Sequence, residues 1–306
     1  IPEYDFKADL NRVDLGALNL VDKDWVLSGK IQKIKLFARN LDDLRGAIVL
    51  RNFQLIQDKK YHHHVDSLTF AAANRPNGNR YFILLSDIAD GILEGRFEVN
   101  KMAANALQFF QQYYPNLSRQ SFGVQAYDST YLNDNYKVNI QIKNTRSLTK
   151  LLDPDLDTLR NVNIRANMNA RAGTSDFRLD LPAFRYDGLG LYDADLVWSN
   201  ERDRGSFTVN VPKTVMADGR QIAHIHFSGD MADDAVKFTL NTEDTTSIVK
   251  KINLRGALST VDTLWQLHFN AAAITLFDEQ WYMEDENYLR FSDSYFEARN
   301  FDLMSG

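Results

Sequence analysis

The chain has no cysteine among its 306 residues, which excludes disulfides and thiolate chemistry. An absence of cysteine also fits an oxidising envelope compartment. Basic residues are in the minority, with 35 Lys and Arg against 41 Asp and Glu and a net charge of −6. A nucleic-acid surface needs clustered Lys and Arg, so we expect no nucleic-acid partner. No apolar run approaches the ~20 residues needed to span a bilayer.

The most regular feature is the alternation of apolar and polar residues between Asn161 and Ala172. Val162, Ile164 and Met168 fall on one side, and asparagines and arginines fall on the other. A period of two predicts an extended strand, because successive strand side chains point to opposite faces. A strand of this length, roughly 40 Å at ~3.3 Å per residue, is about double the usual strand and indicates a large curved sheet.

Similar strand signals return along the whole chain, separated by short polar turns such as 75–79. Together they predict roughly 16 to 20 strands and an all-β fold. At 306 residues the chain exceeds the usual size of a single core, so we expect two domains or an elongated architecture. We place a β-meander region with one helix at residues 1–118 and an elongated repetitive β region at 119–306. One continuous groove across 1–306 is the alternative.

Helical spacing interrupts the strand pattern in one clear place. Asn100 is a good N-cap, apolar residues recur at helical spacing over 101–114, and we expect Pro115 to end the helix. The stretch 115–120 then becomes the best boundary between regions. A second, shorter helix is expected over Asp9 to Val21.

Catalytic and metal-binding motifs are missing from the sequence. It contains no Gly-x-Ser-x-Gly, no His-Glu-x-x-His and no phosphate-binding loop, so we expect neither an enzyme nor a cofactor. His224 and His226 lie two apart on a predicted strand and could share a metal, but no third ligand is visible. We therefore expect no catalytic residue and no metal site.

Apolar residues on the alternating strands remain as the candidate functional surface. They could pack against a second sheet, as in a sandwich, or line an open trough that holds a ligand; the alternation alone leaves both open. On the second interpretation, the predicted fold is a long antiparallel curved sheet forming an open groove, with one or more short helices. The groove candidates are Val162, Ile164, Met168, Phe207, Val209, Phe238, Leu240, Leu267 and Phe269.

Three blocks of sequence carry a resemblance to a known family. The blocks are Leu27–Ile31 with Asn40–Gly46, Asp87–Gly95, and Phe277–Trp281 with Glu286–Tyr288 and Ala298–Leu303. They resemble repetitive motifs of the TamB family, the translocation and assembly module proteins related to the AsmA-like group, and most closely its Bacteroidetes branch. The resemblance covers most of the chain.

This resemblance implies a β-taco, a sheet folded into a trough with an apolar interior. Family members are anchored in the inner membrane, cross the periplasm of Gram-negative bacteria, and are associated with phospholipid movement and outer-membrane protein assembly. The expected partners are therefore phospholipid acyl chains and outer-membrane assembly proteins, with no cofactor and no catalytic residues. We interpret the chain as a periplasmic piece of a longer protein whose membrane anchor lies outside it.

Overall fold

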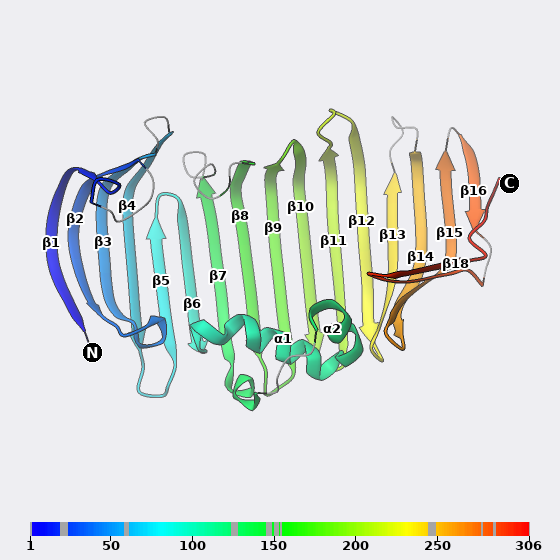
Figure 1. Cartoon of the computed structure of the whole chain (residues 1–306), viewed down its shortest axis with the longest axis horizontal. Coiled ribbons are helices and arrows are strands. Elements are labelled where there is room, and N and C mark those ends of the chain that lie inside the picture. The colour runs from blue at the N-terminus through cyan, green and yellow to red at the C-terminus, as the bar shows by residue number, and fades with distance from the viewer. Residues whose placement is uncertain are drawn as a thin grey trace. The chain divides into compact units, whose positions relative to one another are not determined.

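The computed structural model describes residues 2–18, 24–57, 61–123, 128–144, 149, 153, 155–243, 249–276, 278–283 and 286–305. These residues form 19 strands, two α-helices and three short 3-10 helices. The strands belong to one open antiparallel sheet (Figure 1). The predicted fold class, mainly β with a long antiparallel sheet and short helices, is confirmed.

The chain divides into two compact units. Unit 1 comprises residues 1–102, 135–165 and 183–187, and unit 2 comprises residues 103–134, 166–182 and 188–306. The sequence had suggested a division at residue 118, with the helix on the N-terminal side. In the structure, residues 103–122, which form nearly all of both helices, belong to unit 2.

In unit 1 each strand pairs with the next one along the chain, from β1 to β7. The 3-10 helix η1 (Leu41–Asp43) connects the second and third strands, and η2 (Val99–Lys101) follows the sixth strand. The strands are β1 (Glu3–Asp14), β2 (Trp25–Phe37), β3 (Arg45–Gln57), β4 (Tyr61–Asn74), β5 (Arg80–Ser86), β6 (Ala89–Arg96) and β7 (Asn135–Asn144).

Unit 2 repeats this plan from β10 to β15, again with each strand paired to the next. β15 then pairs with both β16 and β17, on either side of a bulge. Residues of β8 (Leu156–Asn169) and β9 (Thr174–Tyr186) fall in both units. The further strands are β10 (Leu189–Glu201), β11 (Arg204–Val215), β12 (Gln221–Ala232), β13 (Ala235–Glu243), β14 (Val249–Val261), β15 (Leu264–Leu276), β16 (Glu279–Met283), β17 (Tyr288–Ser292), β18 (Tyr295–Arg299) and β19 (Leu303–Ser305).

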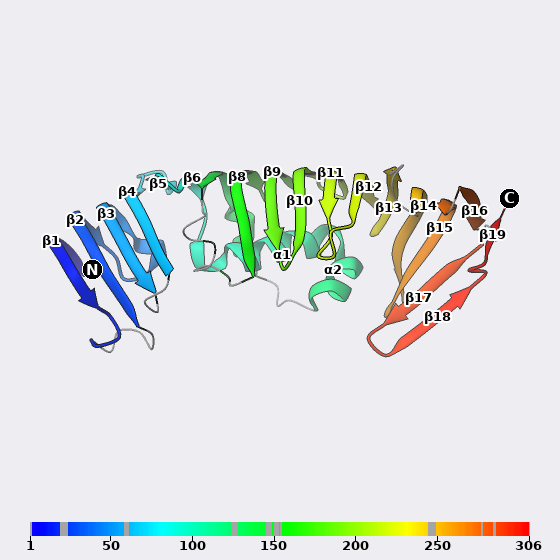
Figure 2. The same cartoon turned by 90° about the horizontal axis from the view of Figure 1, so that it is seen from above.

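The helices α1 (Met102–Tyr113) and α2 (Pro115–Phe122) follow one another with a sharp turn at Tyr114. A third 3-10 helix, η3 (Ser129–Asn133), leads into β7. Both α-helices lie on the same side of the unit 2 strands (Figure 2). None of the helices in the described residues combines the length and the apolarity that a membrane crossing requires.

Two of the expected helix boundaries are wrong. Pro115 does not end the helical region; it occupies the first turn of α2, where its missing N–H costs nothing and its fixed φ favours the helix. Over Asp9 to Asp14 the chain is strand β1 rather than a helix, and the register slips between Leu10 and Val13. A bulge there places residues three apart on one face, which imitates helical spacing.

The long strand predicted over 161–172 exists, but its boundaries differ. It begins at Leu156 and ends at Asn169, because residues 170–173 form a turn. The Asn169 side chain accepts a hydrogen bond from the Ala172 N–H at 3.1 Å, and Gly173 has φ +75°. Asn and Gly both favour turns, so local turn chemistry overrides the alternation of Ala170 and Ala172.

Candidate functional site

Unit 2 has one face on which apolar residues lie side by side from β10 to β15. Residues directly opposite each other in neighbouring strands share a face, so the strand register identifies these neighbours. We call this surface the unit 2 apolar face. Its residues are Leu196, Trp198, Phe207, Val209, Val211, Ile225, Phe227, Met231, Val236, Phe238, Leu240, Ile252, Leu254, Leu258, Trp265, Leu267, Phe269, Ala272 and Ile274, with glycines at 205, 229 and 256.

The opposite face of the same strands is polar. It includes a hydrogen-bonded group in which the Asn210 amide donates to both carboxylate oxygens of Asp195, at 3.2 and 3.1 Å. The ring Nδ1 of His226 lies 2.5 Å from the side-chain Oδ1 of Asn210. Strands that are polar on one face and apolar on the other need a second layer or a ligand on the apolar side.

The helices supply a second layer at one end of the apolar face. Phe110 of α1 packs on Trp198 with 5.3 Å between ring centroids. Tyr114 and Leu117 are buried against Met231. Burial, together with the charge of Asp203, raises the pKa of Tyr114 to about 12, and its hydroxyl donates to the Asn200 Oδ1 at 2.6 Å. The phenol is therefore a neutral, permanently protonated donor at physiological pH.

The tips of β-hairpins hold these helices in place. Asp234, in the turn between β12 and β13, accepts hydrogen bonds from the backbone N–H groups of Asn116 at 2.8 Å and Leu117 at 3.1 Å. Gln120 donates to the carbonyl of Thr263, in the turn between β14 and β15. The helices thus follow the turn ends of the strands and cover the adjoining part of the apolar face.

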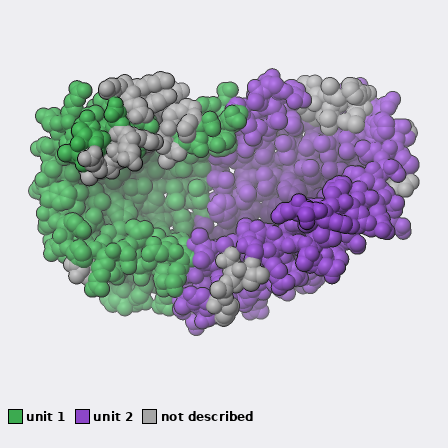
Figure 3. Space-filling view, viewed as in Figure 1, with its two compact units in different colours: residues 1–102, 135–165, 183–187 green, residues 103–134, 166–182, 188–306 purple. Residues whose placement is uncertain are grey.

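Farther from the turns the apolar face is half-exposed. Val209, Phe227, Leu240 and Leu254 are all neither buried nor fully exposed. No second sheet covers these side chains within the described part of unit 2. The space-filling view shows a recessed surface in this unit, bordered by atoms that are closer to the viewer (Figure 3). The sandwich interpretation of the alternating residues is therefore wrong for these strands.

Unit 1 has an apolar face of its own, built by the same rule. One row crosses all seven strands, and its members are half-buried except for the exposed Phe6. The neighbouring row is also mainly apolar. Its Phe82 packs edge-on against Phe97, with 5.7 Å between ring centroids. The first row is Phe6, Ile34, Ile48, Phe70, Leu84, Gly91 and Ile140, and the second is Tyr4, Leu36, Gly46, Ala72, Phe82, Leu93 and Val138.

No protein-family model, curated protein or solved structure matches this chain.

Six of the nine groove candidates lie together on the unit 2 apolar face: Phe207, Val209, Phe238, Leu240, Leu267 and Phe269. The other three lie on β8, with Val162 and Ile164 in unit 1 and Met168 in unit 2. Val162, Met168 and Phe269 are 2%, 8% and 9% exposed, so all three are packed in the interior and offer little surface to a ligand. Ile164 is half-buried.

Other residues of this face escaped sequence reasoning. Phe227 and Leu254 lie between the predicted candidates, and the glycines at 229 and 256 align with Phe207 and Phe238. The signal was present in the alternation of each strand, but the pairing register was needed to align one strand with the next.

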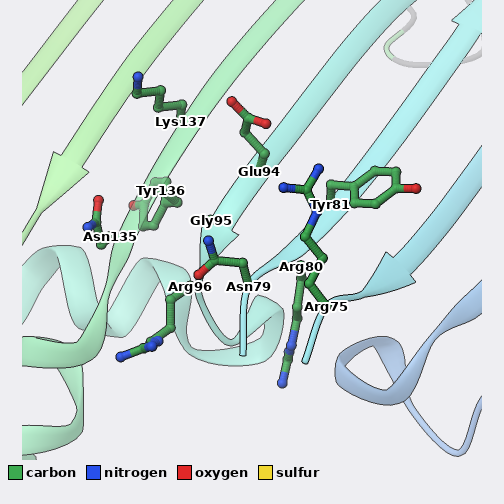
Figure 4. Close-up of a pocket in the computed structure, with 10 residues that line it drawn as sticks. All are labelled: Arg75, Asn79, Arg80, Tyr81, Glu94, Gly95, Arg96, Asn135, Tyr136 and Lys137. Atoms are coloured by element: carbon green, nitrogen blue, oxygen red, sulfur yellow. The ribbon is translucent and has the colours of Figure 1, made fainter. Parts of the chain in front are cut away.

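A polar cavity of about 430 Å³ lies between β5, β6 and β7 in unit 1. Arg75, Arg96 and Lys137 border it, together with Glu94 (Figure 4). In the close-up the Arg96 and Lys137 side chains point in different directions rather than toward a common point. Among the described residues, no group of three or more His, Asp or Glu side chains is placed to hold a metal ion. His224 and His226 therefore have no third ligand in this part of the chain.

Proposed function

We propose that this chain is a periplasmic part of an inner-membrane-anchored, TamB-like protein whose apolar faces bind phospholipid acyl chains. In this role it conducts phospholipid between the inner and outer membranes. The observation that carries the proposal is the half-exposed apolar face of each unit. Large continuous apolar surfaces are uncommon on soluble proteins and mark sites for ligands or partners. The resemblance to the TamB family adds the phospholipid and the envelope location.

The energetics of acyl-chain transfer support such a surface. Moving a chain of roughly 15 methylenes into water costs on the order of 12 kcal/mol, at ~0.8 kcal/mol per methylene. An apolar face offsets much of this cost. Hydrophobic contact is non-directional, so neighbouring positions along the face have similar energies and a chain can slide between them. The charged headgroup can stay in water, because the apolar faces are only partly covered and their side chains are half-exposed.

Leu240 and Thr239 provide a matched test, because they are adjacent residues on opposite faces of β13. Leu240 lies between Phe227 and Leu254 on the apolar face, whereas Thr239 lies between Ser228 and Arg255 on the polar face. The assay is crosslinking of detergent-free protein to a phospholipid with a photoreactive group in its acyl chain. We expect Leu240→Glu to reduce crosslinking at least about tenfold, because a carboxylate on the face opposes contact with hydrocarbon.

Thr239→Glu introduces the same charge one residue away and should leave crosslinking unchanged. Equal crosslinking in the two variants would contradict the proposal. Native mass spectrometry of the protein purified without detergent gives an independent check, because bound phospholipid should be retained. Protein that carries no lipid and crosslinks none would likewise refute it.

A second candidate function is a scaffold for outer-membrane protein assembly by strand addition. The observation that favours it is β1, which pairs with β2 alone among the described strands of unit 1. Tyr4 and Phe6 on this strand are 52% and 45% exposed. An open strand edge can template an incoming strand. The test is binding of peptides that correspond to strands of outer-membrane proteins. Binding that added phospholipid does not displace would favour this function over lipid conduction.

A further inference from the structure

A single row of residues on the unit 2 apolar face alternates between phenylalanine and glycine. The register places Phe207 opposite Gly229, Gly229 opposite Phe238, Phe238 opposite Gly256, and Gly256 opposite Phe269. The row therefore crosses five consecutive strands, β11 to β15, at right angles to their direction.

The rings of this row lie over the glycines. A Cβ atom placed on Gly229 would be 2.7 Å from two ring atoms of Phe207, and one placed on Gly256 would be 2.8 Å from the Cζ of Phe238. Both glycines are buried, whereas the rings of Phe207 and Phe238 are half-buried. At the β15 end of the row Phe269 is buried and packs edge-on against Phe301, with 5.8 Å between ring centroids, so the exposed part of the row ends there. An aromatic ring that covers a glycine lies low against the backbone, so the row has little relief.

Other apolar side chains border the row on both sides. On the side away from the helices they are Val209, Phe227, Leu240 and Leu254. The ring of Phe227 packs against both rings of the row, with 5.1 Å between its centroid and that of Phe207 and 5.9 Å to that of Phe238. On the helix side they are Met231, Val236, Leu258 and Leu267. Beside each glycine the flanking residues on the same face of the strand are larger, with Phe227 and Met231 beside Gly229 and Leu254 and Leu258 beside Gly256. We call the row the furrow for this reason.

The furrow has the length of a lipid tail. Three strand spacings of ~4.8 Å give about 14 Å from β11 to β14. One acyl chain spans about 15 Å, half of the ~30 Å hydrocarbon thickness of a bilayer. A straight chain laid along the furrow could therefore contact the rings of Phe207 and Phe238, which lie on alternate strands, and end at Phe269.

We infer that the row Phe207–Gly229–Phe238–Gly256–Phe269 orients an acyl chain across the strands and selects saturated chains over cis-unsaturated ones. This inference rests on the proposed function and specifies its substrate. A saturated chain can remain straight and stay in contact with the low rings. The bend at a cis double bond directs part of the chain out of the furrow or against a ridge, and those contacts are lost.

The test compares two fatty acids of equal length, palmitate and cis-palmitoleate, by displacement of a fluorescent fatty acid. We expect the full chain to bind palmitate about fourfold more tightly, which corresponds to the contact of roughly one methylene. Phe238→Leu keeps the position apolar but removes the ring that covers Gly256. In this variant the ratio of the two affinities should fall to about one.

Phe37→Leu in unit 1 is the matched control. Phe37 is also a strand phenylalanine, but it lies on the face of β2 opposite to the apolar face, between Glu3 and Arg45. Its replacement should preserve the fourfold ratio. If Phe238→Leu fails to fold, as judged by its urea unfolding curve, Phe207→Leu takes its place, because it uncovers Gly229.

The outcomes separate the two proposals. Failure of the unmodified chain to bind either fatty acid would overturn the lipid function itself. Binding of both with equal affinity, or a preference that survives Phe238→Leu, would overturn only the role of the row. Loss of the preference in Phe37→Leu as well would also overturn it, because the effect would then belong to aromatic content in general.

Discussion

Asp234 should control the attachment of helix α2 to the sheet. The N-cap residue of α2, Tyr114, makes no side-chain capping bond, and the Asp234 carboxylate instead accepts from the N–H groups of Asn116 and Leu117. These are the second and third residues of the helix, which an N-cap side chain normally satisfies. A hairpin turn more than a hundred residues away in sequence thus performs the capping role.

The size of the effect follows from two separate terms. Losing an N-cap acceptor costs about 1–2 kcal/mol. Asp234 also has φ +57°, a conformation that Asp, Asn and Gly tolerate but that costs Ala a further ~1 kcal/mol. We therefore expect Asp234→Gly to destabilise α2 docking by about 1–2 kcal/mol. Asp234→Ala should cost about 2–3 kcal/mol by adding the backbone term.

Hydrogen exchange at the amides of Asn116 and Leu117 measures this docking directly. Each 1.4 kcal/mol lost should speed exchange about tenfold where exchange follows local opening. Asp233→Gly is the control, because Asp233 shares the turn and has φ +52°. Unchanged exchange at Leu117 in Asp234→Gly, or equal acceleration in Asp233→Gly, would refute the capping role.

Three further predictions concern stability, and urea unfolding measures each of them. Tyr114→Phe removes the donor to Asn200 Oδ1 and should cost about 1–3 kcal/mol, and an unchanged midpoint would contradict this. Burial and the nearby His62 hold the pKa of His63 below its usual 6.5, so the folded state binds fewer protons and stability should fall as the pH drops below 6.5. His63→Gln should flatten this dependence, and an equally steep fall in the variant would refute the assignment. A Cβ on Gly256 would lie 2.4 Å from a backbone oxygen, whereas the nearest atom to one on Gly91 is 3.7 Å away. We therefore expect Gly256→Ala to cost about 1–3 kcal/mol of unfolding free energy and Gly91→Ala under about 0.5 kcal/mol. Similar losses in the two variants would contradict the close approach at Gly256.

The faces of individual strands were accessible from sequence because alternation acts locally. Leu240 and Thr239 differ in polarity, and this difference alone predicts that they point to opposite sides of β13. The fold class followed for the same reason, since the pattern recurs along the chain. The same rule groups six of the groove candidates, and the strand register of unit 2 aligns these six on one face.

Alternation does not predict which residues of neighbouring strands lie opposite each other, and it does not predict bulges or turns. The furrow was not predictable, because the alignment of Gly229 with Phe207 and Phe238 depends on pairing register. In β1 the apolar residues Leu10 and Val13 are three apart, which is typical of a helix, but a bulge places them on one face of a strand. Pro115 on its own predicts the end of a helix, and the residue that caps α2 instead, Asp234, is distant in sequence.

The distant anchoring of the helices has a consequence for the order in which the protein forms. In the paired regions of β1–β7 and β10–β15 each strand joins the next one in the chain, so hairpins can form as soon as they leave the ribosome. The hydrogen-bond partner of Leu117, Asp234, is synthesised 117 residues later, and that of Gln120, Thr263, is synthesised 143 residues later. During synthesis the aromatic side of both helices therefore stays without its docking surface. Shortened versions that end with β12 would contain both α-helices and still lack the turn at Asp234 that secures α2.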